Sequence, residues 1–307
     1  GYNSNVLNGI ENNYQTYNGK ELEVDFEKNT LAYGWRDYDS AIGRFNKIDR
    51  FAEKNYDKTP YHYGANNPIY FIDVAGDSLY ITHRRGFLGL GRKETLRYEN
   101  GKLYNSDNTE YTGKVKGFLL KSTNALAKIA EGQEGSSMIS ELQASKNTFT
   151  IQKGSESKHK ATNVAKAHAN QIATDPGQAS LRTSIQNKGI NLSGGSGSNI
   201  FWNPSGSPLI TTSGTSTNAI TDLAHEMFHG LDANRGVLDD RNHNGLKRTE
   251  WQATYRENVL RVQLGLPARM YYNISLNKSI GDRTGLAPRM LSPAPTNTPI
   301  LPSWYNK

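Results

Sequence analysis

Apolar residues recur at intervals of three and four along the second half of the chain, which is the period of an amphipathic α-helix. This spacing predicts helices over residues 116–131, 136–145, 161–175, about 218–235 and about 248–265. For the fourth helix, Ser216 or Thr217 is the expected N-cap and Gly236 the expected C-terminal stop. Hydroxyl side chains accept hydrogen bonds from the first amides of a helix, and glycine tolerates the left-handed backbone that ends one.

Short runs of β-branched and aromatic residues between turn signals predict strands. Such runs cover residues 78–85 and 147–154, and residues 94–106 predict a hairpin that turns at Asn100-Gly101. Residues 191–208, NLSGGSGSNIFWNPSGSP, allow two interpretations. They form either a flexible connection or an edge strand beside a cleft, whose backbone an extended peptide could pair with.

The amino-acid composition changes near residue 78. Residues 14–77 are dense in Tyr, Asn, Asp and Gly, which predicts short strands and turns. We therefore expect two domains, 1–77 and 78–307, and the second ends in a proline-rich tail over 287–307 that follows the surface without regular structure. The predicted fold class is α+β, with a short β-rich segment followed by a small mixed sheet and helices.

Composition limits the chemistry. The 307 residues suffice for two domains with their own cores, and 10% aromatic residues are too many for a disordered chain. The absence of cysteine excludes disulfides and thiolate zinc sites, so that any metal must be bound by His and carboxylates. No stretch approaches the roughly 20 apolar residues of a membrane span. The start, GYNSNVLNG, is neither a signal peptide nor an initiator methionine, and we expect a longer polypeptide.

The formal net charge is +7, but Lys and Arg are scattered along the sequence. No compact basic run is interleaved with aromatic residues, as a nucleic-acid-binding segment would require. We therefore expect no nucleic-acid partner.

The sequence LAHEMFHG contains the pattern H-E-x-x-H inside the predicted helix 218–235. The spacing of i and i+4 puts His225 and His229 on one helix face, one turn apart, where both imidazoles can bind one ion. Glu226 lies beside the first of them and is the expected general base for water activated by the metal. The pattern thus predicts a Zn²⁺ site.

A catalytic zinc takes three protein ligands as a rule, so a third must come from elsewhere in the chain. Asp232 and Arg235 stand where the long-spaced His form of the motif would need Gly and His, which excludes that form. A Glu on the following helix is the other common solution, and we predict Glu250. The alternatives left open are Glu257, whose other interpretation is a surface ion pair with Arg261 at i+4, and Asp239, Asp240 and His243.

Residues 17–76 include YGWRDYDSAIGRFNKIDRFAEK and YHYGANNPIYFIDVAG, and in this they resemble the core associated with Rhs/YD repeats. The resemblance implies that an upstream Rhs shell of the same polypeptide encloses a toxin encoded after the core. In some members the core is an aspartyl autoprotease, and Asp39, Asp49 and Asp73 would be the matching acids. This sequence has Asp49-Arg50 and Asp73-Val74 where the family has Asp-Pro. The alternative interpretation of these acids is that they form turns.

Residues 190–275 resemble bacterial effector zinc peptidases of the gluzincin type, through LAHEMFHG, NIFWNP and EWQATYREN. The resemblance implies a zincin-like fold and a zinc endopeptidase that cleaves a protein of a target cell. Clostridial neurotoxin proteases share this logic and use an Arg-x-x-Tyr pair at the oxyanion. Arg269 and Tyr272 have that spacing, although the tyrosine could equally belong to a strand that packs into the core.

The two resemblances together imply a toxin that a bacterial secretion system delivers into a target cell, with a cognate immunity protein as a partner. Two other functions stay open. Asn242-His243-Asn244 faintly matches a metal-dependent nuclease motif, and a zinc ion could instead stabilise a non-catalytic binding module.

Overall fold

The computed structural model describes residues 21–23, 30–32, 37–39, 41–47, 79–85, 91–107, 109–273 and 287–305. The chain forms two compact units, Gly1–Gly76 and Asp77–Lys307. No helix among the described residues is both long enough and apolar enough to cross a membrane.

The described strands of the first unit form one antiparallel sheet in sequence order. They are β1 (Glu21–Glu23), β2 (Thr30–Ala32), β3 (Asp37–Asp39) and β4 (Arg44–Phe45). Tyr38 and Phe45 are buried, and their rings meet edge to face with centroids 5.9 Å apart. The Asp39 carboxylate accepts a hydrogen bond of 2.9 Å from the amide of Ala41, which is a turn-forming contact. Asp49 and Asp73 lie outside the described residues.

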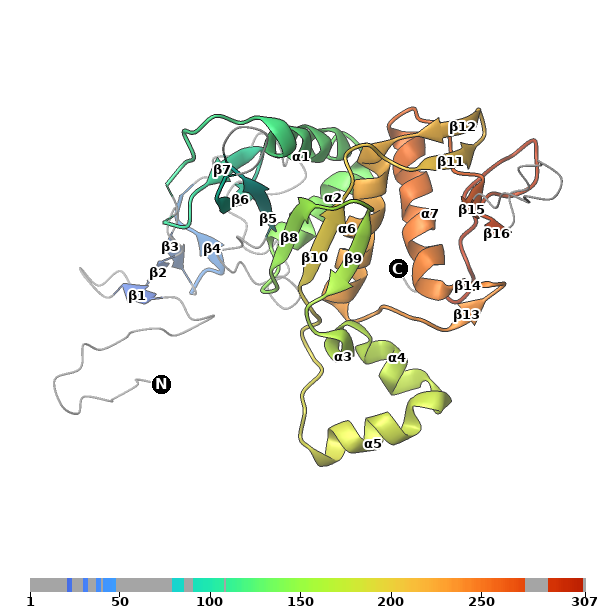
Figure 1. Ribbon diagram of the computed structural model, residues 1–307. Helices are drawn as coiled ribbons and strands as arrows, with labels where there is room; N and C mark the ends of the chain where they lie inside the picture. Colours follow the sequence, from blue (N-terminus) through green and yellow to red (C-terminus); the bar gives the residue numbers. More distant parts are fainter. Residues whose placement is uncertain are drawn as a thin grey trace. The chain divides into compact units, whose positions relative to one another are not determined.

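The second unit is built on a six-stranded mixed sheet of order β7-β6-β5-β8-β10-β9 (Figure 1). Its strands are β5 (Leu79–Arg84), β6 (Lys93–Glu99), β7 (Lys102–Tyr104), β8 (Phe149–Lys153), β9 (Lys158–Ala161) and β10 (Ser198–Trp202). β8 pairs in parallel with both β5 and β10, and the remaining pairs are antiparallel. Asn100 (φ 47°) and Gly101 (φ 82°) close the β6–β7 hairpin with two positive φ angles, which confirms the predicted turn.

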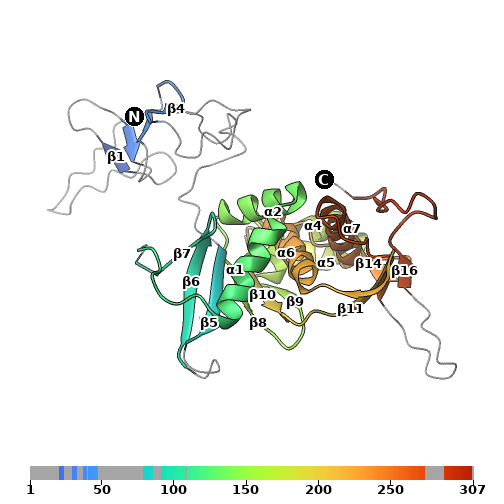
Figure 2. The same ribbon diagram turned by 90° about the horizontal axis from the view of Figure 1, so that it is seen from above.

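One hydrophobic core joins this sheet to four helices, which Figure 2 shows from above. They are α1 (Gly117–Ile129), α2 (Gln133–Gln143), α6 (Ala219–Arg235) and α7 (Arg248–Gln263). α6 lies over β9 and β10, while α7 packs on α6 and α2. The predictions of helices at these places are confirmed, and so is the α+β class.

The N-cap of α6 differs from the expected one. Asn218 accepts hydrogen bonds from the amides of Ile220 (3.1 Å) and Thr221 (3.2 Å), whereas Ser216 and Thr217 pair in a strand. That hairpin consists of β11 (Pro208–Thr211) and β12 (Gly214–Thr217). Gly236 ends α6 at φ 71°, as predicted.

Residues 161–175 do not form the single helix that their spacing predicts. β9 extends to Ala161, and two short helices follow, α3 (Val164–Ala167) and α4 (Ala169–Thr174). The Asn163 side chain caps α3 by accepting a hydrogen bond of 3.0 Å from the amide of Lys166. A 3-10 turn (Pro176–Gln178) and α5 (Ala179–Asn187) complete this arm, which extends from the sheet in Figure 1.

Both interpretations of residues 191–208 are wrong for the strand NIFW. β10 is neither flexible nor at an edge, because it pairs with β8 on one side and β9 on the other. Ser198, Ile200 and Trp202 alternate as its buried residues. The edge strand of the sheet on this side is β9.

The proline-rich tail contains regular structure, contrary to the prediction. β16 (Ala287–Arg289) pairs antiparallel with β15 (Tyr271–Asn273). Met290 and Leu291 follow it and are buried, at 2% and 0% exposure. Their burial anchors the tail beside a small hairpin of β13 (Asn242–His243) and β14 (Leu246–Lys247), whose Leu246 shares a cluster with Met290.

Candidate metal centre

α6 presents His225 and His229 on one face, and both side chains are buried. Their Nε2 atoms are 3.2 Å apart. Glu250 lies in the first turn of α7, and its Oε2 atom is 3.2 Å from the Nε2 atom of each histidine. The pairing of α6 with α7 thus gathers three donor atoms at one point.

The equal spacing of these donors fits a metal ion. Zinc bound to nitrogen and oxygen at about 2.0–2.1 Å in a tetrahedron requires ligand atoms about 3.3 to 3.4 Å apart. Two imidazoles and one carboxylate are also a ligand set typical of catalytic zinc, and they leave a fourth position for water or substrate. The donor set and its spacing therefore suit zinc.

A second layer of oxygen atoms holds the donors in place. The Nδ1 atom of His225 is 3.1 Å from Oε2 of Glu257, and the Nδ1 atom of His229 is 3.3 Å from Oγ1 of Thr249. The hydroxyl of Tyr272 donates a 2.9 Å hydrogen bond to Oε2 of Glu250. Such contacts fix the tautomer and orientation of metal-binding histidines.

Glu257 is completely buried and links His225 to two arginines. Its carboxylate accepts hydrogen bonds from Nε of Arg261 (2.7 Å) and Nη1 of Arg269 (2.8 Å). Burial alone would raise the pKa of Glu257, but the two guanidinium groups outweigh it and hold the pKa well below its usual range. The ion pair with Arg261, which was the other interpretation of Glu257, is confirmed, whereas its expected surface location is wrong.

Arg269 is linked to the cluster through Glu257. Besides Glu257, its guanidinium donates to the carbonyl oxygens of Tyr271 and Tyr272. These contacts occupy the side chain with Glu257 and the β15 backbone. A role of Arg269 at the oxyanion stays a prediction.

Glu226 is half-buried and has no hydrogen-bond or ion-pair partner in the part of the chain that the structure describes. Burial raises the pKa of its carboxyl above the usual value. A raised pKa makes a carboxylate a better proton acceptor. The charges of His225, His229 and Glu250 act on this carboxyl group, which places it in the vicinity of the three donors.

The electrostatics of the cluster favour a cation. Burial would lower the pKa of His225, but its hydrogen bonds to Glu250 and Glu257 outweigh burial and raise the pKa to about 10. The carboxylates thus stabilise positive charge between the imidazoles. A divalent ion would supply that charge.

The other ligand candidates are engaged elsewhere. Asp239 accepts hydrogen bonds from Arg241 and Arg248, and Asp240 pairs with Lys247 at 3.1 Å. His243 stacks edge to face on two tryptophans, Trp251 and Trp304. None of the three belongs to the cluster.

Sequence reasoning missed His159 on β9. Its ring lies 5.8 Å from that of His229, and its Nε2 atom is 2.7 Å from Oγ of Ser198. Burial lowers its pKa to about 3, so the imidazole is neutral. The alternation in Lys158–Ala161, with both lysines exposed, was the available signal for this inward-facing histidine.

Asp222, in the first turn of α6, is expected to reduce stability at neutral pH when no metal is bound. Burial and the charge of Glu257 raise its pKa from 3.8 to about 6, although it accepts a 2.7 Å hydrogen bond from the amide of Ser207. The folded state binds the proton of Asp222 more tightly than the unfolded state does. The bound proton therefore stabilises the fold below pH 4, and this stabilisation is lost as pH rises through 6. In EDTA, Asp222→Asn should increase the unfolding free energy by roughly 2 kcal/mol at pH 7.5 and little at pH 4. Urea unfolding at both pH values measures it, and a gain independent of pH would contradict it.

The α+β fold and the buried His-His-Glu cluster place the protein among candidate metal-dependent hydrolases. Residues 105–272 match the model of the Peptidase M91 family, which is described as an effector protein family. The match covers more than half of the chain, and the chain belongs to this family. No curated protein and no solved structure matches the chain.

Family membership makes the protein a peptidase of the effector class. An effector acts on a target cell, and a peptidase acts on a protein substrate. All three donors of the cluster lie inside the matched residues.

Proposed function

We propose that the protein is a zinc-dependent endopeptidase whose metal is held by His225, His229 and Glu250. The observation that carries this proposal is the mutual spacing of 3.2 Å among their donor atoms, on an H-E-x-x-H helix within a peptidase family match. The domain is zincin-like in this proposal. Its sheet and its motif-bearing helix α6 support that assignment.

Bound zinc would act as a Lewis acid that polarises the scissile carbonyl and lowers the pKa of a water molecule. Glu226 accepts a proton from the attacking water and later delivers it to the leaving amine, as the carbon–nitrogen bond breaks. Tyr272 is the proposed donor to the oxyanion, and for this its single hydroxyl proton turns from Glu250 to the substrate. Arg269 supports the site through Glu257 and the carbonyl of Tyr272.

An extended peptide fits the edge of the sheet beside the cluster. β9 is the edge strand, and its His159 lies next to His229. A peptide that pairs with the outer edge of β9 would use main-chain hydrogen bonds for affinity and would pass close to the three donors.

The wider context of the proposal rests on the sequence of residues 17–76. Their resemblance to the Rhs/YD-repeat core supports a toxin released from an upstream Rhs shell, with a cognate immunity protein in the producing cell. Delivery by a bacterial secretion system agrees with an effector family.

Neither alternative function gains support from the geometry. His243, the centre of the nuclease-like Asn-His-Asn, packs between tryptophans. A structural zinc site is closed by four protein ligands, whereas this cluster supplies three among the described residues.

Metal content by mass spectrometry, with cleavage of a mixed peptide library, tests the proposal. Wild type should hold one zinc per chain and cleave peptides. Glu250→Ala removes one of three donors and should weaken zinc affinity at least about tenfold and abolish cleavage. Glu131→Ala, at an exposed glutamate on the loop after α1, is the matched control and should resemble wild type. Absence of both zinc and cleavage in the wild type would refute the proposal.

A further inference from the structure

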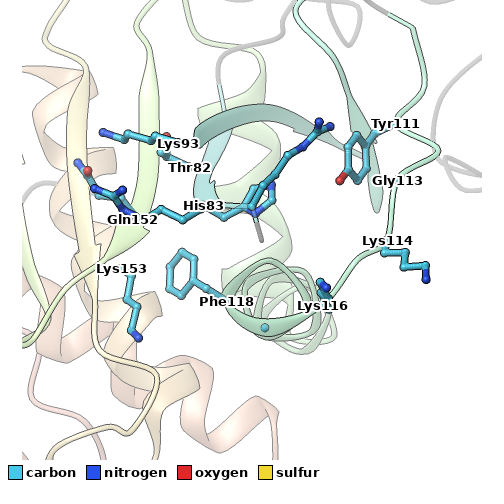
Figure 3. A pocket seen from close by; sticks show the side chains of 13 residues that line it. Thr82, His83, Lys93, Tyr111, Gly113, Lys114, Lys116, Phe118, Gln152 and Lys153 are labelled. Carbon is cyan, nitrogen blue, oxygen red and sulfur yellow. The ribbon is translucent and has the colours of Figure 1, made fainter. Parts of the chain in front are cut away.

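A cavity of about 980 Å³ lies apart from the metal cluster and shares no residue with it. It opens where the parallel strands β5 and β8 end, between Thr82 of β5, Gln152 of β8 and the start of α1 (Figure 3). Small-molecule sites occupy about 300–1,000 Å³ and lie preferentially beyond the carboxyl ends of parallel strands. The volume and the location therefore both suit a small ligand.

Among the described residues, six cationic side chains and no Asp or Glu line this cavity. Arg85 pairs with Glu94 at 2.6 Å. Four lysines have no ion-pair partner in the described part of the chain, and Figure 3 shows them around the cavity: Lys93, Lys114, Lys116 and Lys153. All four are exposed to solvent, which screens their mutual repulsion, and an anion in the cavity would reduce it further. The fold brings lysines that are far apart in the sequence to the walls of one cavity.

The N-terminus of α1 adds to the positive field. Lys116 is its N-cap and makes no side-chain capping hydrogen bond, and the first turn contains no acidic residue. The first amide groups of this 13-residue helix are therefore open to an acceptor, at the positive end of the helix dipole. Phe118 in the first turn lies against Trp202, with ring centroids 5.7 Å apart, and lines the cavity together with Tyr111.

We propose that this cavity binds a small organic molecule that carries several phosphate groups. These four lysines and the first amides of α1 bind the phosphates, and the rings of Phe118 and Tyr111 contact the carbon skeleton. A concave site of this size favours a compact ligand over a nucleic-acid strand, which requires an extended groove. The same chemistry is offered by a free polyphosphate and by a phosphoinositide headgroup.

Calorimetric titration of the full chain with inositol hexakisphosphate tests this proposal. We expect one saturable site per chain, with an affinity that falls as salt rises. Lys116→Gln with Lys153→Gln should weaken binding at least tenfold. Lys121→Gln with Lys146→Gln removes the same charge at exposed lysines outside the cavity and should leave binding unchanged. Equal weakening in both pairs would overturn the proposal, because it would indicate attraction by net charge alone.

Four further measurements make the result specific. Inositol hexakisphosphate also chelates metals, and binding must therefore persist in EDTA-treated protein as well as in zinc-loaded protein.

Binding to vesicles with phosphatidylinositol 4,5-bisphosphate, but not to free inositol phosphates, would support the site and identify a lipid source. Tighter binding of a duplex oligonucleotide that displaces the ligand, or saturation by inorganic phosphate at the same concentration, would overturn the proposal. Failure of peptide cleavage leaves this test unaffected.

Discussion

Glu226→Gln is expected to lower the rate of peptide cleavage by about 10²- to 10⁴-fold while zinc stays bound. Glutamine keeps the size of the side chain but cannot accept the proton of the attacking water. Glu226 has no hydrogen-bond partner among the described residues, so the substitution breaks no contact there. Cleavage of a peptide found in a library screen gives the rate, and mass spectrometry gives the metal content.

Glu131→Gln is the matched control for that variant, because Glu131 pairs with Lys128 on the surface. It should cleave at the wild-type rate. Full activity of Glu226→Gln would remove this residue from the mechanism, and loss of zinc together with activity would show that it supports the metal rather than the proton transfer.

Glu257→Gln should cost about 3 to 5 kcal/mol of unfolding free energy in the metal-free protein. The substitution leaves Arg261 and Arg269 without their buried counter-charge, and both guanidinium groups are nearly inaccessible to water. Zinc affinity should also fall about 10- to 100-fold, because the Nδ1 atom of His225 loses its carboxylate partner. Urea unfolding, followed by the fluorescence of the buried Trp202 and Trp251, measures the first effect.

Glu141→Gln provides the comparison, since Glu141 pairs with Arg235 at the surface end of α6. An exposed pair of this kind contributes about 0 to 1 kcal/mol. If both variants lost a similar amount of unfolding free energy, the burial of Glu257 would not account for its contribution to stability.

The sequence predicted the His-His-Glu cluster through local rules. A spacing of four on a helix puts His225 and His229 together whatever surrounds them, and a glutamate on the next helix follows from the need for a third ligand. Glu257 is different. Its i+4 pairing with Arg261 is visible in the sequence, but its contact with His225 joins residues on two helices and depends on how α6 packs against α7. Periodicity does not report such packing.

The errors in the predicted fold have the same origin. Residues 158–161 form a strand because they pair with β10. The residues that follow have helical spacing, and the predicted helix therefore begins at residue 161, inside that strand. The tail forms β16 because β15 presents an unpaired edge. In both places a partner distant in the sequence decides the local structure.

The pairing of β15 with β16 means that the segment matched by the family model is shorter than the segment that folds together. The family match ends at residue 272, within the strand whose Tyr272 holds Glu250 in place. The neighbouring strand of that tyrosine comes from residues 287–289, beyond the match. If effector domains of this kind are exchanged between carrier proteins, a portable module must extend past the matched segment, because the strand that pairs with β15 comes from residues 287–289.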